Sequence, residues 1–251
     1  MIIDLNADLG EGLGQWAMTD DEALLSIVTS ANVACGFHAG DPTQMLKVCR
    51  IAAAQGTSVG AHVAYRDLIG FGRRFIDVEP SELAADVLYQ LHAIDGIARS
   101  AGTTLRYVKP HGALYNTIVH HESQARAVVE ALTLFGRDLP VMGLPGALWL
   151  QIAAAAGMRT VHEAFPDRGY TPEGRLAPRG TAGGKLTDSD EIAARAVRLA
   201  RDRSIVAIDG STIAIEADSL CVHGDTPTAV ATAAAVRHAL TDAGIEIQAF
   251  A

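Results

Sequence analysis

Lys109 and His111 occupy the position in this sequence that most needs a chemical explanation. Both follow an apolar run that predicts a buried strand over residues 104–108, and Pro110 ends that strand because it has no backbone N–H to donate. A buried lysine costs free energy unless a partner compensates its charge. Lys109 could stay charged beside carboxylates and stabilise an oxyanion, or lose its charge through desolvation and act as a nucleophile. His111 could act as a general acid or base near neutral pH.

Polar residues also follow four other predicted strands. They lie in the segments Asn6-Ala7-Asp8, Gly36-Phe37-His38-Ala39-Gly40-Asp41, Gly60-Ala61-His62 and His223-Gly224-Asp225. Because the carboxyl ends of barrel strands meet at one face, we expect all five segments to converge on one site. Within it, Asp8, His38 and His62 could bind a divalent metal, since carboxylates and imidazoles are common ligands. The same three residues could instead hold a substrate and move protons.

A second group of charged residues lies in and just before residues 165–185, a segment too rich in proline and glycine for the interior of a helix or strand. Glu163 ends a predicted strand, and Arg168 and Arg179 lie within the segment. These three residues could bind a carboxylate substrate, with arginine making two parallel hydrogen bonds. The remaining histidines lie on helices or away from strand ends, and we interpret them as structural or exposed: His92, His120, His121, His162 and His238.

The elements that position these residues alternate between strand and helix. Apolar runs predict seven core strands, near residues 1–8, 31–35, 57–61, 104–108, 141–142, 160–163 and 219–222. Asp41 and Pro42 are typical of the N-cap and first position of a helix over 42–55, and Ser81 is the expected N-cap of another helix. The pair Asp209-Gly210 between alternating apolar residues predicts a β-hairpin.

Alternating strands and helices predict a parallel α/β architecture. Polar residues mark nearly every strand end, which favours a closed or nearly closed barrel over a doubly wound sheet, where they would gather at one switch point. No repeat or linker interrupts the pattern, so we expect one barrel domain over residues 1–251.

Composition excludes several classes of function. The net charge of −9 and the absence of a basic run argue against a nucleic-acid partner. The three cysteines form no CxxC pair, which suits a reducing cytoplasm. No apolar run approaches the ~20 residues of a membrane-spanning helix. We therefore expect a cytoplasmic protein that acts on a small molecule.

Taken together, five motifs of the chain resemble the LamB/YcsF family. They are DLNADLGEGLG, ANVACGFHAGDP, GAH followed by DLIGFGRR, YVKPHGALYN and CVHGD. Each is weak alone, but five in order are highly specific. The resemblance implies an irregular seven-stranded (β/α) TIM-like barrel, similar to the glycoside hydrolase/deacetylase superfamily. The family's motif positions correspond here to Asn6, Asp8, Glu11, His38, Asp41, His62, Arg73, Arg74, Lys109, His111, Asn116, Arg179, His223 and Asp225.

One departure from the family pattern lies in the loop after His62. The family usually has prolines where this chain has Val63 and Arg66. The change bears on the rigidity of the loop and on substrate preference.

The resemblance also implies an activity, the cleavage of 5-oxoproline (pyroglutamate) to L-glutamate coupled to hydrolysis of ATP. The chain would be the A subunit of the 5-oxoprolinase complex, with subunits B and C as its partners. A five-membered lactam is a stable amide, so its hydrolysis benefits from conversion of its oxygen into a phosphate leaving group. The sequence has no Walker motif or kinase signature, so we expect the phosphoryl-transfer machinery to lie partly or wholly in a partner subunit.

In this hypothesis an arginine or lysine binds the substrate carboxylate. Asp8 or His111 activates the nucleophile, and Lys109 stabilises charge on the ring oxygen. Two alternatives remain open at the level of sequence. One is a metal-dependent deacetylase or other carbohydrate hydrolase that uses Asp8, His38 and His62. The other is a subunit that binds a small acid without turnover.

Overall fold

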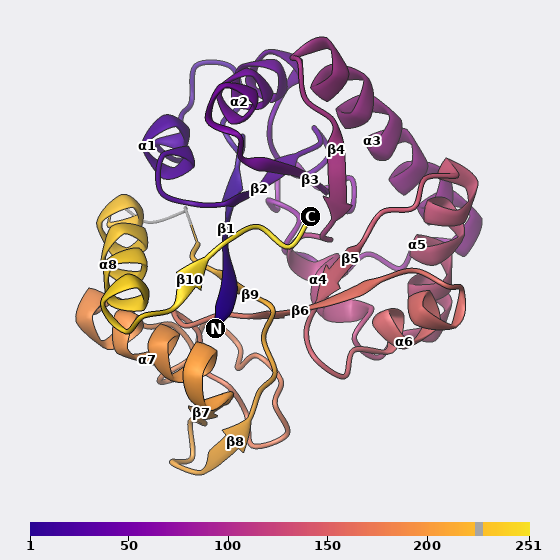
Figure 1. Ribbon diagram of the computed structural model, residues 1–251. Helices are drawn as coiled ribbons and strands as arrows, with labels where there is room; N and C mark the ends of the chain where they lie inside the picture. The colour runs from indigo at the N-terminus through magenta and orange to yellow at the C-terminus, as the bar shows by residue number, and fades with distance from the viewer. Residues whose placement is uncertain (224–227) are drawn as a thin grey trace.

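A closed barrel of seven parallel strands forms the centre of the computed structural model, which describes residues 1–223 and 228–251 (Figure 1). In order around the barrel the strands are β1 (Ile2–Leu9), β2 (Ser30–Ala34), β3 (Ser58–His62), β4 (Leu105–Val108), β5 (Val141–Gly143), β6 (Thr160–Ala164) and β9 (Ser219–Cys221). Strand β9 pairs in parallel with both β6 and β1, and this closes the barrel. The expected irregular seven-stranded barrel is confirmed.

Helices surround the barrel on its outer side (Figure 1). The longer ones are α2 (Pro42–Gln55), α3 (Pro80–Ser100), α5 (Glu122–Phe135), α6 (Leu148–Ala155), α7 (Ser189–Asp202) and α8 (Ala229–Asp242), and two short ones are α1 (Asp21–Leu25) and α4 (Gly112–Thr117). Their buried faces pack on the outer side chains of the strands in one large apolar cluster. Among the described residues, no helix is both long and apolar enough to cross a membrane.

The structure confirms one of the two expected N-caps and contradicts the other. The side chain of Asp41 accepts the backbone N–H groups of Thr43 and Gln44, which confirms it as the N-cap of α2. The expected cap at Ser81 is wrong, because α3 begins at Pro80 and Glu79 holds the N-cap position without a side-chain bond. Proline suits the first helical position, since its φ is already helical and its missing N–H would have no partner there.

The chain outside the barrel adds a hairpin and a C-terminal strand. Strands β7 (Ser204–Val206) and β8 (Thr212–Ala214) pair antiparallel, which confirms the hairpin. Strand β10 (Glu246–Ile247) extends the sheet beside β1. The C-terminus then crosses the amino-terminal end of the barrel (Figure 1). There the Phe250 ring contacts Tyr107 at a centroid distance of 5.0 Å.

The barrel interior is polar, whereas such interiors are usually filled by branched aliphatic side chains. Near the amino-terminal end, Asp4 Oδ1 accepts the hydroxyls of Thr29 and Ser30, each at 2.7 Å, and its Oδ2 accepts that of Ser219. The next layer links Asn6, Asn32 and Tyr107. Asn32 Nδ2 donates to Asn6 Oδ1 and the Tyr107 hydroxyl donates to Asn32 Oδ1, both at 2.7 Å. These bonds compensate the polar groups for their loss of water.

Two glycine-to-alanine substitutions should change stability in opposite directions. A Cβ at Gly60 in β3 would lie 2.2 Å from the buried Tyr107 ring, whereas one at Gly96 in α3 would meet nothing within 4 Å. We expect Gly60→Ala to lower the free energy of unfolding by about 1–3 kcal/mol through overpacking. Gly96→Ala should raise it by about 0.5–1 kcal/mol through helix propensity. Urea denaturation measures both, and equal effects would contradict the close approach at Gly60.

Asp4 should make stability depend on pH in mildly acidic solution. Burial raises the pKa of Asp4 to about 6, although the hydroxyls of Ser219, Ser30 and Thr29 act in the opposite direction. Its contribution to stability is therefore full below the unfolded pKa near 3.9 and is lost as pH rises through about 6. We expect the stability of the parent chain to fall by roughly 3 kcal/mol relative to Asp4→Asn across this window. Urea denaturation at several pH values measures this difference. If the free energies of unfolding of the parent chain and of Asp4→Asn change in parallel with pH, the raised pKa of Asp4 is contradicted.

Candidate functional site

The polar strand ends converge at the carboxyl face of the barrel on a cavity of about 470 Å³. Its described lining includes Asp8, His62, Arg73, Lys109, His111, Asn116, His120, Phe165, Arg168, Arg175, Arg179 and His223. Five of these side chains are cations and one is a carboxylate. A concave site with convergent polar groups is the usual place for a ligand, and here it favours an anionic one.

Lys109 lies at the floor of the cavity as a fully buried ammonium. Its Nζ is 2.9 Å from Asp8 Oδ1, 2.8 Å from Glu163 Oε1 and 3.2 Å from Cys221 Sγ. Burial alone would lower the pKa of Lys109, but the negative charge of Asp8, with Cys221 and Glu163, holds it well above its usual value. The geometry thus favours a charged lysine over the neutral, nucleophilic one.

Asp8 lies at the end of β1 between Lys109 and the histidines. Its Oδ1 accepts Asn32 Nδ2 at 2.9 Å and lies 3.3 Å from His62 Nε2. Burial would raise the pKa of Asp8, but His62 and Lys109 hold it well below its usual range. Asp8 is therefore an ionised carboxylate in the cavity wall.

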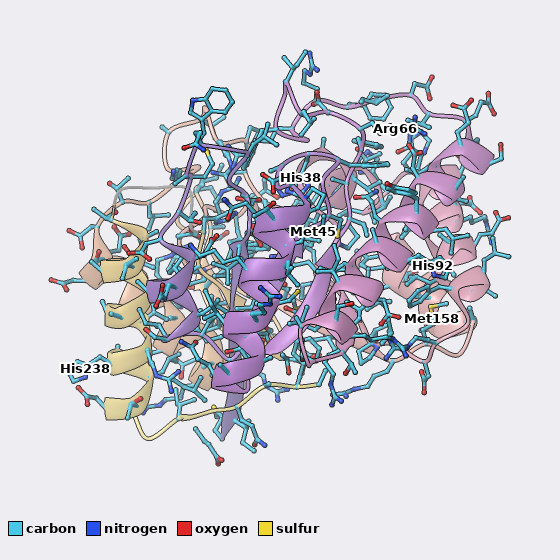
Figure 2. All side chains as sticks on the ribbon, turned by 90° about the horizontal axis from the view of Figure 1, so that it is seen from above. His38, Met45, Arg66, His92, Met158 and His238 are labelled. Carbon is cyan, nitrogen blue, oxygen red and sulfur yellow. The ribbon has the colours of Figure 1, made fainter. Side chains whose placement is uncertain are left out.

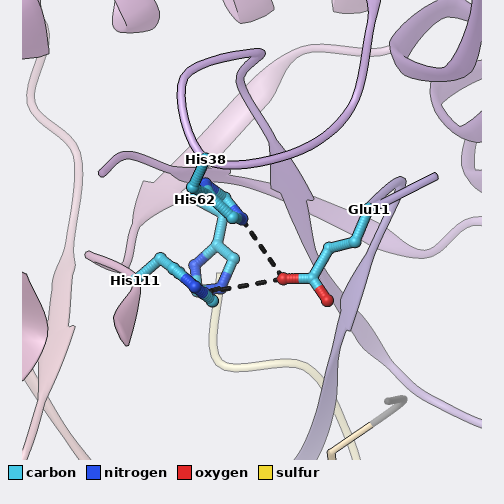
Figure 3. Close-up of side chains that lie close together, drawn as sticks. All are labelled: Glu11, His38, His62 and His111. Carbon is cyan, nitrogen blue, oxygen red and sulfur yellow. Dashed lines mark hydrogen bonds and ion pairs between the residues drawn. The ribbon is translucent and has the colours of Figure 1, made fainter. Parts of the chain in front are cut away.

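Three histidines and a glutamate form a compact buried cluster (Figure 3). Asp8 lies beside it, in contact with His62. Glu11 Oε1 lies 3.2 Å from His38 Nε2 and 3.5 Å from His111 Nδ1. His111 Nδ1 lies 3.0 Å from His62 Nε2, and the rings of His38 and His111 stack at 3.8 Å. Burial and the neighbouring imidazoles keep the pKa values of His38 and His111 well below their usual range. These two rings are neutral.

The composition of this cluster differs from the set expected as a metal site. One potential ligand atom each from Glu11, His38, His62 and His111 lies within 4.8 Å of the others, and these four residues could hold a metal ion. Asp8 stands beside the cluster, in contact with His62 and Lys109. The chain turns at Gly10, where φ is +70°, and this brings Glu11 back toward the histidines.

A second pair, His223 with the buried Asp167, borders the cavity. His223 Nδ1 lies 2.7 Å from Asp167 Oδ2, and the His223 ring stacks on Phe165. Burial would raise the pKa of Asp167, but His223 keeps it below its usual value. The sequence did not identify Asp167 and Phe165 as site residues, because residues 165–185 show no helix or strand periodicity that would place their side chains. His120, expected to be structural or exposed, also lines the cavity.

Several arginines line the cavity, and one of them also holds a loop in place. Arg168 is buried, and it donates to the carbonyls of Gly184 at 2.9 Å and Ala177 at 2.6 Å, so it fixes the loop of residues 165–185. Arg73, Arg175 and Arg179 also line the cavity, and the Arg73 guanidinium lies 4.9 Å from the centre of the Phe71 ring.

The structure places other expected substrate-binding residues away from the cavity. Asp41 caps α2, Arg74 pairs with Asp67, and Asn6 lies in the layer below Lys109. Glu163 is fully buried and serves as a partner of Lys109. Asn116 does line the cavity and donates to the Gly112 carbonyl at 2.9 Å. Asp225 lies outside the described residues.

The loop that lacks the family's prolines is held by side-chain contacts to α3. Arg66 Nε donates to Asp86 at 2.9 Å, and the amide of Gln90 bonds both the N–H and the carbonyl of Ala64. The Val63 carbonyl accepts the N–H of His111 at 2.8 Å. These contacts hold the loop against α3 and against the segment that carries His111.

Comparison with known proteins agrees with this geometry. A model of the LamB/YcsF family matches residues 3–251. A protein of Kocuria rhizophila, named as the A subunit of 5-oxoprolinase, is 60% identical over 250 residues, covering 100% of this chain and 99% of the relative. One of the same name from Streptomyces coelicolor is 59% identical, with 100% of both chains covered.

Among solved structures, the lactam utilization protein of Thermus thermophilus superposes with a TM-score of 0.95 at 45% identity, over 100% of both chains. The polysaccharide deacetylase Bc1974 of Bacillus cereus matches with a TM-score of 0.53 at 14% identity, over 100% of this chain and 92% of the other, and shows a shared fold alone. From the family match and the level of identity, this chain belongs to the LamB/YcsF family.

Proposed function

We propose that this chain is the A subunit of an ATP-dependent 5-oxoprolinase that acts in a complex with subunits B and C. The reaction cleaves 5-oxoproline to L-glutamate while ATP is hydrolysed to ADP and phosphate. The observation that carries the proposal is Lys109, an ammonium fixed between Asp8 and Glu163 at the floor of an arginine-lined cavity. The names of the relatives from Kocuria and Streptomyces support the same activity.

The charges of the cavity suit the two ends of 5-oxoproline. Its carboxylate matches the guanidinium groups of Arg73, Arg175 and Arg179, because arginine binds carboxylates with two parallel hydrogen bonds. Its ring oxygen then faces Lys109, where a fixed positive charge stabilises the negative charge of that oxygen and of the phosphoryl group it carries. The low polarity of a buried floor strengthens that stabilisation.

Asp8 is better placed than His111 to activate the nucleophile. His111 Nε2 lies 2.9 Å from the Phe71 carbonyl, and its Nδ1 faces His62 and Glu11, so both ring nitrogens are directed into the barrel wall. Asp8 is ionised and lines the cavity, and its contacts with Asn32 and Lys109 are made by Oδ1. Its other oxygen is the one that would accept a proton from water.

ATP is needed because the lactam is a stable amide that must be activated before water can open the ring. Transfer of the γ-phosphoryl group of ATP to the ring oxygen releases ADP and activates the carbonyl carbon. Water adds there, and the C–N bond breaks as the nitrogen takes up a proton to become the amino group of γ-glutamyl phosphate. A second water cleaves this acyl phosphate to glutamate and phosphate. Because the sequence carries no Walker or kinase signature, we assign the phosphoryl-transfer step to subunits B and C, and the ring-opening step to the cavity of this chain.

Reconstitution tests this division of labour. We expect ATP-dependent release of glutamate from 5-oxoproline by the three purified subunits together, and none by this chain alone, with a larger lactam assayed in parallel to define the range of substrates. Full activity of the single chain would contradict the shared machinery. Binding of 5-oxoproline without turnover in any combination of subunits would favour the small-acid-binding alternative.

Substitutions at the cavity floor should lower kcat more than they raise KM. We expect Asp8→Asn to reduce kcat about 10²-fold or more through loss of the base. Lys109→Met leaves two buried carboxylates unpaired and is expected to destabilise the chain by about 3–5 kcal/mol. The double variant Lys109→Met with Glu163→Gln neutralises one of the two carboxylates and so reduces that penalty, and its kcat should still fall about 10²–10³-fold.

The matched control is Arg126→Gln, which removes an exposed pair with Glu122 on α5. It should leave both kinetic constants unchanged. A folded double variant that retains the parent kcat would exclude a role for Lys109 in stabilising the oxyanion.

A further inference from the structure

We propose that Glu11, His38, His62 and His111 bind one divalent transition-metal ion, with zinc as the best fit. The cluster lies beside the cavity floor, and its affinity for a metal does not depend on the identity of the substrate. In place of Asp8, His38 and His62, the set expected from the sequence, the folded chain brings together the ligand atoms of these four residues (Figure 3).

The spacing of the four atoms suits a single ion. Ligands of tetrahedral zinc lie about 2.0–2.1 Å from the metal and hence about 3.3 Å from one another. The observed separations are 3.0 Å between His62 Nε2 and His111 Nδ1, and 3.2 and 3.5 Å from Glu11 Oε1 to His38 Nε2 and His111 Nδ1. All four atoms lie within 4.8 Å of one another, so small rotations of the side chains bring them to bonding distance.

The hydrogen bonds on the far side of two rings fix which nitrogen carries a proton. His62 Nδ1 lies 3.0 Å from the Lys109 carbonyl, and His111 Nε2 lies 2.9 Å from the Phe71 carbonyl. A carbonyl oxygen can only accept, so His62 Nδ1 and His111 Nε2 are the donors in these two bonds. The facing atoms, His62 Nε2 and His111 Nδ1, are therefore the ring nitrogens available to a shared metal ion. Bonds of this kind orient the imidazoles of metal sites.

The cluster consequently directs several electron pairs at one point. Glu11 adds a carboxylate oxygen, and Asp8 Oδ1 lies 3.3 Å from His62 Nε2. Such an arrangement requires positive charge between the atoms, supplied by a metal ion or by an added proton on one imidazole. A metal satisfies all four ligand atoms at once, whereas one proton can bridge only two of them.

The backbone around the cluster is built to hold the rings close. A Cβ at Gly72 would lie 2.7 Å from His38 Cβ and 2.8 Å from His111 Cδ2, so only glycine fits there. Phe71 has φ of 54°, a left-handed conformation that is unfavourable for a phenylalanine. This conformation directs its carbonyl at His111, and strained residues of this kind gather at functional sites.

The donor set selects the class of metal. Three imidazoles and one carboxylate favour zinc and similar late transition metals, whereas magnesium prefers an all-oxygen octahedron with several waters. A divalent ion bound to the Glu11 carboxylate gives this cluster a net charge of +1. That charge complements the single negative charge left by Asp8 and Glu163 around Lys109.

Metal binding would assign separate roles to neighbouring residues. His62 and His111 line the cavity, so the ion would become part of the wall next to the floor. An imidazole that ligates a metal through one nitrogen and donates to a carbonyl through the other carries no proton to transfer. Proton transfer in the cavity is then left to Asp8.

The test is the metal content of the full chain, purified without affinity histidines and without chelator. We expect about one zinc ion per chain, reduced at least tenfold in His38→Gln and His111→Gln. The control is His238→Gln on the outer face of α8, remote from His38, where an exposed histidine pairs with Asp242 (Figure 2). This control should keep the full metal content, and loss of the ion in it would place the metal at the surface and overturn the proposal.

A second measurement uses the parent chain, so that the proposal can be tested even where the variants fail to fold. Chain stripped by chelator and returned to buffer should gain several degrees in Tm with zinc and none with magnesium, since a ligand that binds only the folded state stabilises it. Cobalt should give the visible absorption of a four-coordinate nitrogen-rich site. A stripped, folded chain that shows neither change would overturn the proposal. Because no substrate is present, this result is independent of the 5-oxoprolinase reaction.

Discussion

The positive charge of Lys109, enclosed by the barrel, sets the requirements that the residues around it meet. An ammonium removed from water needs counter-charges, and Asp8 and Glu163 provide them at 2.9 and 2.8 Å. Those carboxylates are buried in turn, so Asp8 takes a further bond from Asn32. The network continues through Tyr107 and Asn6 toward the amino-terminal end, which explains why hydrogen bonds occupy the interior in place of aliphatic layers.

The site divides into a rigid wall and a mouth carried by loops. On the wall, the histidine rings are fixed by backbone carbonyls and by the close approach of Gly72. At the mouth, the loop of residues 165–185 supplies arginines. The buried Arg168 cross-links the loop internally, and Asp167 fastens it to His223 after β9. This division suits an enzyme that holds its reacting groups in place while its loops select the ligand.

Much of the architecture could be predicted because its signals are local. The apolar runs located all seven barrel strands, and Asp41 with Pro42 located the start of α2. Lys109 could be singled out because a lysine at the end of a buried strand needs partners wherever the chain folds. The motifs that resemble the LamB/YcsF family point to the same family that the full-length match established.

The partners of these residues were decided by the tertiary structure. Sequence alone could not choose between Asp8 and Glu11 as the neighbour of the histidines, because the turn at Gly10 directs the two side chains to different places. Asp167 meets His223 only after β9 pairs with β6, and Glu163 meets Lys109 only after β4, β5 and β6 pair side by side. Strand ends are determined by local composition, whereas the contacts between them depend on barrel closure and loop dihedral angles that no short segment specifies.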